Sequence, residues 1–476
     1  MANQVKTMFG NMSWLMVSII LASVFGFVWT IVLAPYLGVT DYGVFGFAIS
    51  ITSLLGVFND FGVGTQIIRA IASDKNVTDK YLGNAFSLRF VFAVIYCTVI
   101  FIVLTILKSS PQTILITLLF ALEVVIKSFS GLCNSTFDAH EKNKYHAYAE
   151  ISLNLCTLVF ILVAVFFDLG LLGVAFAYIF ANICSLSFNF FNIRRSIIKP
   201  KLHFDFKFWK QLLIWGIPFA LTSIFYTIYY QIDIVMLTKM VDSYATGMYN
   251  ASYKLINVLT LFYGIYSVVI FPVMSKFFHS EKNLLKVSYE KSIKYLLLFS
   301  LPAAFGMSFY ATDIINLIYG SQYAGAGVIL QILVWTVVLI FVNGATANLL
   351  NASHQEISVT RIYLLAAIFN VVLNLFMIPR YSYVGASSAT VLSDCFICIV
   401  GLYPLYKINH LPSKHLVFDV GKIIIATVIF AVILIILKLN LFIAIPVGIV
   451  IYLILIFVLK ILDDADKNIV HQIIGR

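Results

Sequence analysis

Long apolar runs alternate with short polar segments along the whole chain. A run of about 20 residues is enough for a helix to cross the roughly 30 Å of membrane hydrocarbon. Fourteen runs meet that length, and the last two are joined by only three residues. They begin near Met12, Val44, Ala85, Thr113, Ala147, Leu171, Leu212, Gly247, Ile293, Val328, Arg361, Val384, Val420 and Leu441. The pattern predicts an all-α polytopic membrane protein with about 14 transmembrane helices.

Two neighbouring runs, which begin near Leu212 and Gly247, carry polar residues at helical spacing. In each run the polar side chains fall on one face and apolar residues occupy the rest. Amides and aromatic faces of this kind suit a sugar or a lipid headgroup, although Tyr is also common at membrane interfaces. The predicted polar faces consist of Tyr226, Tyr230 and Asp233 in the first helix and of Asn250, Lys254 and Asn257 in the second.

Asp233 and Lys254 bring opposite charges to membrane depth within this hairpin. Charged groups are costly there and usually face a wet cavity or a partner, so they are functional candidates. Two interpretations stay open. The pair either belongs to a substrate-binding site or is an ion pair that only locks the hairpin.

Three further acids are candidates for energy coupling, since membrane carboxylates that protonate or bind a cation drive many pumps. Asp394 comes first because it has no obvious partner in the sequence. Glu123 comes second, because Lys127 follows it at i+4 and could neutralise it. Asp60 comes third. The alternative for each is a buried structural hydrogen bond. The coupling ion would be H+ or Na+, and no other cofactor is expected.

Composition agrees with the membrane assignment. The 476 residues are 61% hydrophobic and 11% charged, with a mean hydropathy of +0.99, which leaves no soluble domain of useful size. Of 31 Lys and Arg residues, four lie on predicted outer segments, namely Lys108, Lys239, Arg380 and Lys438. Basic residues stay on the cytoplasmic side, so both termini are predicted to be cytoplasmic. The net charge of +10 then reflects a basic inner rim against lipid headgroups, and no nucleic-acid partner is expected.

Arg69 and Arg89 belong to this inner rim, at the inner ends of the second and third predicted helices. They are candidates for receiving an anionic substrate group, although ordinary inner-rim charges are the favoured interpretation. Six cysteines all fall in predicted spans. They read as buried apolar residues, and no metal site is expected.

Internal similarity divides the chain into two halves. Gly43 aligns with Gly247 at an offset of 204 residues, GLCNSTFDAHEKN with GATANLLNASHQE at 213, and LGLLGVAFAY with YSYVGASSAT at 212. The similarity predicts two parallel six-helix repeats around a V-shaped central cavity, plus a terminal helix pair. The predicted parts are an N-terminal lobe at 1–200, a C-terminal lobe at 201–410, and a helix pair with a short cytoplasmic tail at 411–476.

Four segments carry a family resemblance that spans nearly the whole chain. They are LAPYLGVTDYGVFGFAIS, NDFGVGTQIIRAIAS, DIVMLTKMVDSYATGMYNASYKL and IINLIYGSQYAGAGVILQIL. The chain resembles the Wzx-type flippases of lipid-linked oligosaccharides, in the superfamily of multidrug, oligosaccharidyl-lipid and polysaccharide exporters. The resemblance implies two six-helix lobes with two extra helices, in the cell (inner) membrane.

This resemblance implies movement of a polyprenyl-pyrophosphate-linked oligosaccharide from the cytoplasmic to the outer leaflet, for O-antigen, lipopolysaccharide, capsule or a similar glycan. Its partners would be the lipid-linked glycan, membrane lipids, and a glycan polymerase or glycosyltransferases. A cation-coupled drug antiporter of the same superfamily is one alternative. A glycan polymerase or ligase is another, but the longest predicted outer segment, 311–327, holds one acid, Asp313, which argues against an enzyme.

Overall fold

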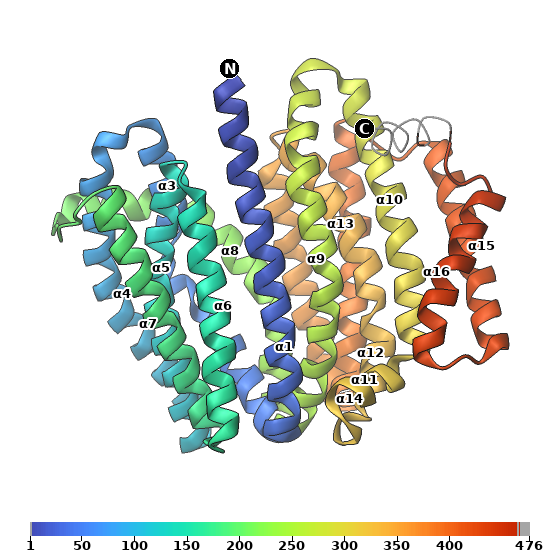
Figure 1. The fold of residues 1–476 in the computed structure, drawn as a ribbon, viewed down its shortest axis with the longest axis horizontal. Helices are drawn as coiled ribbons and strands as arrows, with labels where there is room; N and C mark the ends of the chain where they lie inside the picture. Colours follow the sequence, from blue (N-terminus) through green and yellow to red (C-terminus); the bar gives the residue numbers. More distant parts are fainter. Residues whose placement is uncertain (1, 464–465, 467–476) are drawn as a thin grey trace. The chain divides into compact units, whose positions relative to one another are not determined.

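The computed structural model describes residues 2–463 and 466, and this part of the chain is almost entirely helical (Figure 1). Its elements in chain order are α1 (Ala2–Leu55), α2 (Val57–Asp60), α3 (Val63–Ser73), η1 (Lys75–Val77), α4 (Thr78–Ile106), α5 (Pro111–Ala139), α6 (Asn143–Phe166), α7 (Gly170–Ser196), α8 (Phe206–Met240), α9 (Ser243–Ser280), α10 (Lys282–Phe309), α11 (Ala311–Tyr319), η2 (Ser321–Tyr323), α12 (Ala326–Leu333), α13 (Trp335–Ala352), α14 (Glu356–Lys407), α15 (Lys414–Leu437) and α16 (Leu441–Val458).

Eleven stretches of the described residues are long and apolar enough to cross a membrane. Two of them are unusually long, 40 residues at Met16–Leu55 and 52 residues at Glu356–Lys407. Each contains one non-helical residue, Gly38 in α1 and Ser382 in α14, so each holds two crossings. Helix α8 adds a crossing with its 35 residues. With the two broken helices counted twice and α8 added, the described chain has room for the 14 crossings that the apolar pattern predicts, and the all-α polytopic fold is confirmed.

The chain forms two compact units. Unit 1 comprises Met1–Asn250 with Asn374–Tyr383, and unit 2 comprises Ala251–Leu373 with Val384–Arg476. In unit 1, α6 packs on α1 and α7, and α5 packs on α7. In unit 2, α10 packs on α13 and α15. The predicted lobe boundaries and the predicted central cavity stay predictions.

The backbone repeats where the sequence repeats. Glu141 and His354, 213 residues apart, each adopt a positive φ, 58° and 57°, just after helices α5 and α13. Gly170 and Ser382, 212 residues apart, do the same at 60° and 50°. These are two of the three offsets found by aligning the sequence segments. The two halves therefore share turn conformations as well as residue types, which supports the predicted repeats.

A close helix crossing inside unit 1 shows the same relation. A Cβ added at Gly43 would lie 1.8 Å from the carbonyl oxygen of Ser243, and a Cβ added at Gly247 would lie 1.9 Å from that of Val39. Gly43 and Gly247 are 204 residues apart, and so are Val39 and Ser243, so the two contacts are equivalent under the repeat. The start of α9 thus crosses the second half of α1 reciprocally, with backbone against backbone, which only glycine allows.

Candidate functional site

A buried carboxylate forms the centre of the polar residues that α8 contributes to unit 1. Asp233 is 3% exposed. Its Oδ2 accepts a hydrogen bond from the Tyr249 hydroxyl at 3.0 Å, and its Oδ1 accepts one from Asn374 Nδ2 at 2.5 Å. Tyr249 lies on α9, and Asn374 lies in the segment of α14 that belongs to unit 1. A charge at membrane depth is costly unless it is hydrogen-bonded, and these two donors supply that stabilisation.

The predicted aromatic face of α8 is present. The rings of Tyr226 and Tyr230 lie 4.5 Å apart between centroids, and Tyr229 packs edge-on against Tyr230 at 5.2 Å. Tyr226 is exposed and Tyr230 is half-buried, whereas Tyr229 is buried. The two predicted tyrosines therefore form one accessible aromatic surface, with Asp233 buried further along the same helix.

The polar residues of α9 fall in different surroundings. Asn250 is buried in unit 1 beside Gly46, where an added Cβ would lie 2.8 Å from Asn250 Nδ2. Lys254 is half-buried and Asn257 is exposed, and both belong to unit 2. The predicted pairing of Asp233 with Lys254 stays a prediction.

A second polar group lies where the second crossing breaks. Phe61 and Gly62 adopt left-handed conformations, with φ of 48° and 71°, and separate α2 from α3. Beside this break, the buried Arg89 of α4 pairs with Asp60 and donates to the backbone carbonyl of Asn59. The Asp60 carboxyl is 52% exposed and also accepts a hydrogen bond from Gly62 N. The pair thus holds the broken helix in place and leaves a carboxyl open to its surroundings.

Other contacts fix the same break. Gly216 of α8 approaches so closely that an added Cβ would lie 2.2 Å from the carbonyl oxygen of Phe61. Gln66 Nε2 donates to the carbonyl of Trp215 at 2.7 Å. The predicted rim residue Arg69 lies further along α3 and is exposed. Arg89, by contrast, is buried in the interior of α4 and does not extend from a rim.

Replacing Arg89 by methionine is expected to lower the free energy of unfolding by about 1–3 kcal/mol, because the Asn59 carbonyl and part of the Asp60 carboxyl lose their donor. The pair is half-exposed at Asp60, so the effect stays below that of a fully buried ion pair. The thermal midpoint of the protein in detergent measures the change. Arg195→Met, at an exposed arginine near the end of α7, is the control and should leave the midpoint unchanged. An equal loss in both variants would contradict the prediction.

The other two coupling candidates are buried. Glu123 of α5 is 9% exposed and accepts a hydrogen bond from Asn182 Nδ2 of α7 at 2.8 Å. Lys127 is exposed, and no ion pair joins it to Glu123 in the described part of the chain. Asp394, in unit 2, is 2% exposed, and its backbone carbonyl accepts a hydrogen bond from Asn343 at 3.1 Å. Glu123 is thus hydrogen-bonded to an amide of another helix instead of forming the local ion pair with Lys127.

Unit 2 contains an apolar groove of about 490 Å³ between α10 and α11 on one side and α15 and α16 on the other. Apolar side chains form most of its walls, among them Phe299 and Leu298 of α10, Phe430 of α15 and Ile449 of α16. Gly306 and Gly448 also line it, and their lack of a side chain keeps it open. Such a surface fits an alkyl or isoprenoid chain and offers almost no hydrogen bonds.

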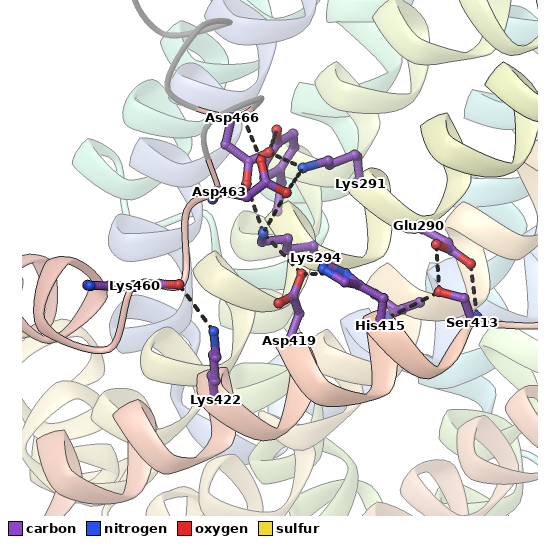
Figure 2. Close-up of polar contacts among 12 residues, drawn as sticks. Glu290, Lys291, Lys294, Ser413, His415, Asp419, Lys422, Lys460, Asp463 and Asp466 are labelled. Atoms are coloured by element: carbon purple, nitrogen blue, oxygen red, sulfur yellow. Dashed lines mark hydrogen bonds and ion pairs between the residues drawn. The ribbon is translucent and has the colours of Figure 1, made fainter.

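A polar cluster lies along the N-terminal half of α10, where Asp463 and Asp466, which follow α16, reach this helix (Figure 2). We call it the C-terminal polar cluster; its members are Lys291, Lys294, Tyr295, Asp419, Asp463 and Asp466. Lys294 is 2% exposed and lies 2.8 Å from Asp466 and 3.1 Å from Asp419 of α15. Lys291 lies 2.5 Å from Asp466. The cluster ties α15, Asp463 and Asp466 to α10.

Burial raises the pKa of the Asp466 carboxyl, but hydrogen bonds from Lys291, Lys294 and Tyr295 outweigh it and hold that pKa well below its usual range. Asp466 is therefore charged throughout the physiological range. Among the described residues, no group of three His, Cys, Asp or Glu side chains could hold a metal ion. The two cysteines at 395 and 398 are unpaired thiols.

Sequence comparison places these features in a family. Residues 9–278, more than half of the chain, match the family described as polysaccharide biosynthesis protein. This chain belongs to the polysaccharide biosynthesis protein family. Residues 218–376 of this family member also match the family described as MatE. The family predicted from the quoted segments is confirmed.

Individual relatives and one solved structure are also similar to this chain. A probable low-salt glycan biosynthesis flippase of Haloferax volcanii is 22% identical over 96% of this chain and 98% of that protein. An uncharacterized membrane protein of Methanocaldococcus jannaschii is 27% identical, and that match spans 58% of this chain and only 56% of that protein. The lipid II flippase MurJ in an inward closed conformation has a TM-score of 0.78 at 18% identity, over 97% of this chain and 99% of that chain. The last match shows a shared fold.

Several candidate functional features of this polysaccharide biosynthesis protein could not be predicted from its sequence. Asn374 comes from a helix 141 residues after Asp233, and nothing in its local pattern marks it as a partner. The apolar groove could not be predicted, because lipid-facing and groove-lining positions are apolar alike. The C-terminal polar cluster did leave a signal, since Lys291 and Lys294 at i and i+3 and Asp463 and Asp466 at i and i+3 are matched charge pairs.

Proposed function

We propose that this protein is a flippase that moves a polyprenyl-pyrophosphate-linked oligosaccharide from the cytoplasmic to the outer leaflet by alternating access. The observation that carries the proposal is the presence of two unlike surfaces in one membrane protein. Unit 1 holds tyrosines, amides and a carboxylate at membrane depth, and unit 2 holds an almost wholly apolar groove. An amphiphilic lipid-linked glycan needs both kinds of surface.

Each part of the substrate has candidate contacts. The glycan would contact the accessible rings of Tyr226 and Tyr230, which lie 4.5 Å apart between centroids, and the amides Asn250 and Asn257. The polyprenyl chain would lie in the apolar groove of unit 2, because it has no hydrogen bonds to lose there. The pyrophosphate would pair with the cation of Lys254, since charge-assisted contacts to phosphate are the strong ones.

The chain would lie in the cell (inner) membrane with both termini cytoplasmic, as the distribution of Lys and Arg predicts. Arg69, exposed on α3, would meet the pyrophosphate on entry. Transport would be driven by H+ or Na+ through Asp394, Glu123 or Asp60, and the protein itself would carry out no chemistry on the glycan. The relative from Haloferax volcanii is named as a glycan biosynthesis flippase, which supports a surface glycan as the product, made with glycosyltransferases or a polymerase as partners.

Deleting the gene tests the function directly. A membrane-impermeant glycosidase reports which leaflet holds the lipid-linked oligosaccharide. The proposal expects the intermediate to accumulate in the deletion strain and to be shielded on the cytoplasmic side. Accumulation on the outer side would overturn the flippase and indicate a polymerase or ligase.

Lys254→Ala is expected to reduce glycan export at least ten-fold while the protein stays in the membrane, because the pyrophosphate loses its deepest cation. Surface glycan and membrane protein are measured in the same cells. Lys254→Arg keeps the charge and should retain most export. Normal export by Lys254→Ala would remove this residue from the substrate site, and restored export after exchanging Asp233 and Lys254 would instead support a purely structural pair.

The match of residues 218–376 to the MatE family favours one second candidate, a cation-coupled drug antiporter. This candidate expects the deletion strain to become sensitive to cationic drugs while lipid-linked oligosaccharide keeps its normal distribution. The same strain therefore separates the two functions.

A further inference from the structure

Two facing lines of polar side chains run through the middle of unit 1, where α5 packs on α7. On α5 they are Glu123, Ser130, Asn134 and Asp138, at i, i+7, i+11 and i+15, which is one helical face. On α7 they are Tyr178, Asn182, Ser185 and Asn189, again on one face. We call the two lines together the α5–α7 polar track. From Glu123 to Asp138 the track covers about 22 Å along α5.

Hydrogen bonds join the two sides of the track. At the deep end, Asn182 Nδ2 donates to Glu123 Oε1 at 2.8 Å. In the middle, Asn189 Nδ2 donates to Ser130 Oγ at 2.7 Å and to Asn134 Oδ1 at 3.0 Å. Ser130 and Ser185 are 3.4 Å apart between hydroxyl oxygens. Residues from the two helices thus alternate along the track.

Titratable groups close the other end, near the α5–α6 turn that joins two membrane spans. Asn134 Nδ2 donates to Glu150 of α6 at 3.3 Å. His146 Nδ1 lies 2.8 Å from Asp138 and His146 Nε2 lies 4.0 Å from Glu150. The side chains of His146, Asp138 and Glu150 are 23%, 26% and 36% exposed. This end can therefore exchange protons with the aqueous phase.

The interior of the track contains polar atoms that the protein does not satisfy. Among the described residues, Tyr178 Oη, Asn182 Oδ1 and Asn189 Oδ1 are buried without a hydrogen-bond partner. Asn182 and Asn189 are 2% and 0% exposed. Buried polar groups are almost always bonded to protein or to ordered water, so three such atoms on one face call for water molecules. Polar residues that only held α5 to α7 would satisfy one another.

Few charges act on Glu123 at the deep end. Its titratable neighbours are Lys127 on its own helix, Tyr178 on α7 and Tyr96 on α4. Lys127 is exposed, and Tyr96 donates to the carbonyl of Thr52 at 2.8 Å. Among the described residues, Glu123 therefore has one direct hydrogen-bond donor, the neutral amide of Asn182.

We propose that the α5–α7 polar track is a hydrated proton route, which connects the carboxyl of Glu123 with the aqueous phase at the His146, Asp138 and Glu150 end. A hydroxonium ion at that end gives up a proton and becomes water, and the carboxylate of Glu123 takes up a proton and becomes neutral. This inference deepens the proposed flippase by naming the coupling ion as H+ and the coupling residue as Glu123. The amides of Asn182 and Asn189 hold the intervening water molecules and are positioning residues.

Infrared spectroscopy of the full-length protein in lipid nanodiscs tests the route without any substrate. The difference between the spectra of wild type and Glu123→Gln isolates the protonated carboxyl band of Glu123 as the pH is lowered from about 9 to about 5. Transfer to heavy water then shifts that band at the rate at which deuterons reach Glu123. In Asn189→Leu we expect this rate to fall at least ten-fold, because an apolar side chain replaces the amide that bridges the track.

Asn192→Leu is the matched control. Asn192 lies on the same helix but off the track, and its amide donates to the carbonyl of Phe188 in its own helix, so its exchange should match wild type. Ser130→Ala interrupts the same bridge and serves where Asn189→Leu does not fold. The route is overturned if no Glu123 band is found at any pH, or if Asn189→Leu and Ser130→Ala both exchange as fast as the control.

The outcome is separable from that of the proposed function. Deuterium exchange needs no glycan and no transport. If exchange at Glu123 depends on the track as expected but the protein does not flip lipid-linked oligosaccharide, the flippase alone would be overturned. A protein that flips, with exchange that is unaffected by the track variants, would overturn the route alone. Flipping in proteoliposomes that responds to a pH gradient in wild type but not in Glu123→Gln would support both.

Discussion

Gly43→Ala is expected to lower the free energy of unfolding by about 3 kcal/mol, at the upper end of the usual cost of overpacking. The added Cβ would lie 1.8 Å from the carbonyl oxygen of Ser243, and the corresponding atom at Gly247 would lie 1.9 Å from that of Val39. Both obstacles are backbone, so no side chain can rotate away, and α1 and α9 must move apart. The thermal midpoint of the protein in detergent, together with its yield in the membrane, measures the effect.

A glycine-to-alanine substitution at an open position of α9 is the control. Gly264 has no heavy atom within 4 Å of an added Cβ, so Gly264→Ala should stabilise the helix by about 0.5–1 kcal/mol. Gly43→Ala and Gly247→Ala open the same crossing, so the double variant should cost less than the sum of the two single variants. A strictly additive loss, or a Gly43→Ala midpoint equal to that of Gly264→Ala, would show that the helices do not cross so closely.

The crossing of α1 and α9 also shows how much of the fold could be predicted from the sequence. Apolar runs of about 20 residues are a strong signal because lipid solvates no backbone, so their number and position could be predicted. The aligned Gly43 and Gly247 marked the repeat. That they touch could not be predicted, since similarity at a fixed offset says that two segments have the same fold and not that they meet.

For the polar residues, the depth could be predicted from the sequence but the hydrogen-bond partners could not. The depth of Asp233, Glu123 and Asp394 follows from their place in apolar runs, and all three are buried. Their partners do not follow, because hydrogen bonds inside a membrane join helices that are distant in sequence. Arg89 is the clearest example. Its distance from the helix end predicts a charge at the inner rim, whereas the structure buries it beside the break at Phe61 and Gly62, where it pairs with Asp60.

Asp466→Asn is expected to have the other large effect, about 3 kcal/mol, because the buried Lys294 loses the nearer of its carboxylates and keeps Asp419 at 3.1 Å. The Asp466 side chain is 1% exposed and faces Lys294, itself 2% exposed, at 2.8 Å. It also accepts a hydrogen bond from the Tyr295 hydroxyl at 2.5 Å. The thermal midpoint again measures the loss. Asp463→Asn is the matched control, since that side chain is 36% exposed and its pair with Lys291 should contribute at most about 1 kcal/mol.

The pH dependence of this effect distinguishes a charge contribution from a loss of shape. The pKa of Asp466 is lower in the folded protein than the roughly 3.9 of an unfolded aspartate, since hydrogen bonds from Lys291, Lys294 and Tyr295 outweigh its burial. Its charge therefore stabilises the fold fully above about pH 4, and this contribution is lost as the pH falls toward the lower folded value. The difference in midpoint between wild type and Asp466→Asn should be constant near neutral pH and shrink below about pH 4. A difference that stays the same down to the lowest pH at which the protein remains folded would mean that the asparagine disturbs packing. The ion pairs of the C-terminal polar cluster would then not be what holds residue 466 against α10.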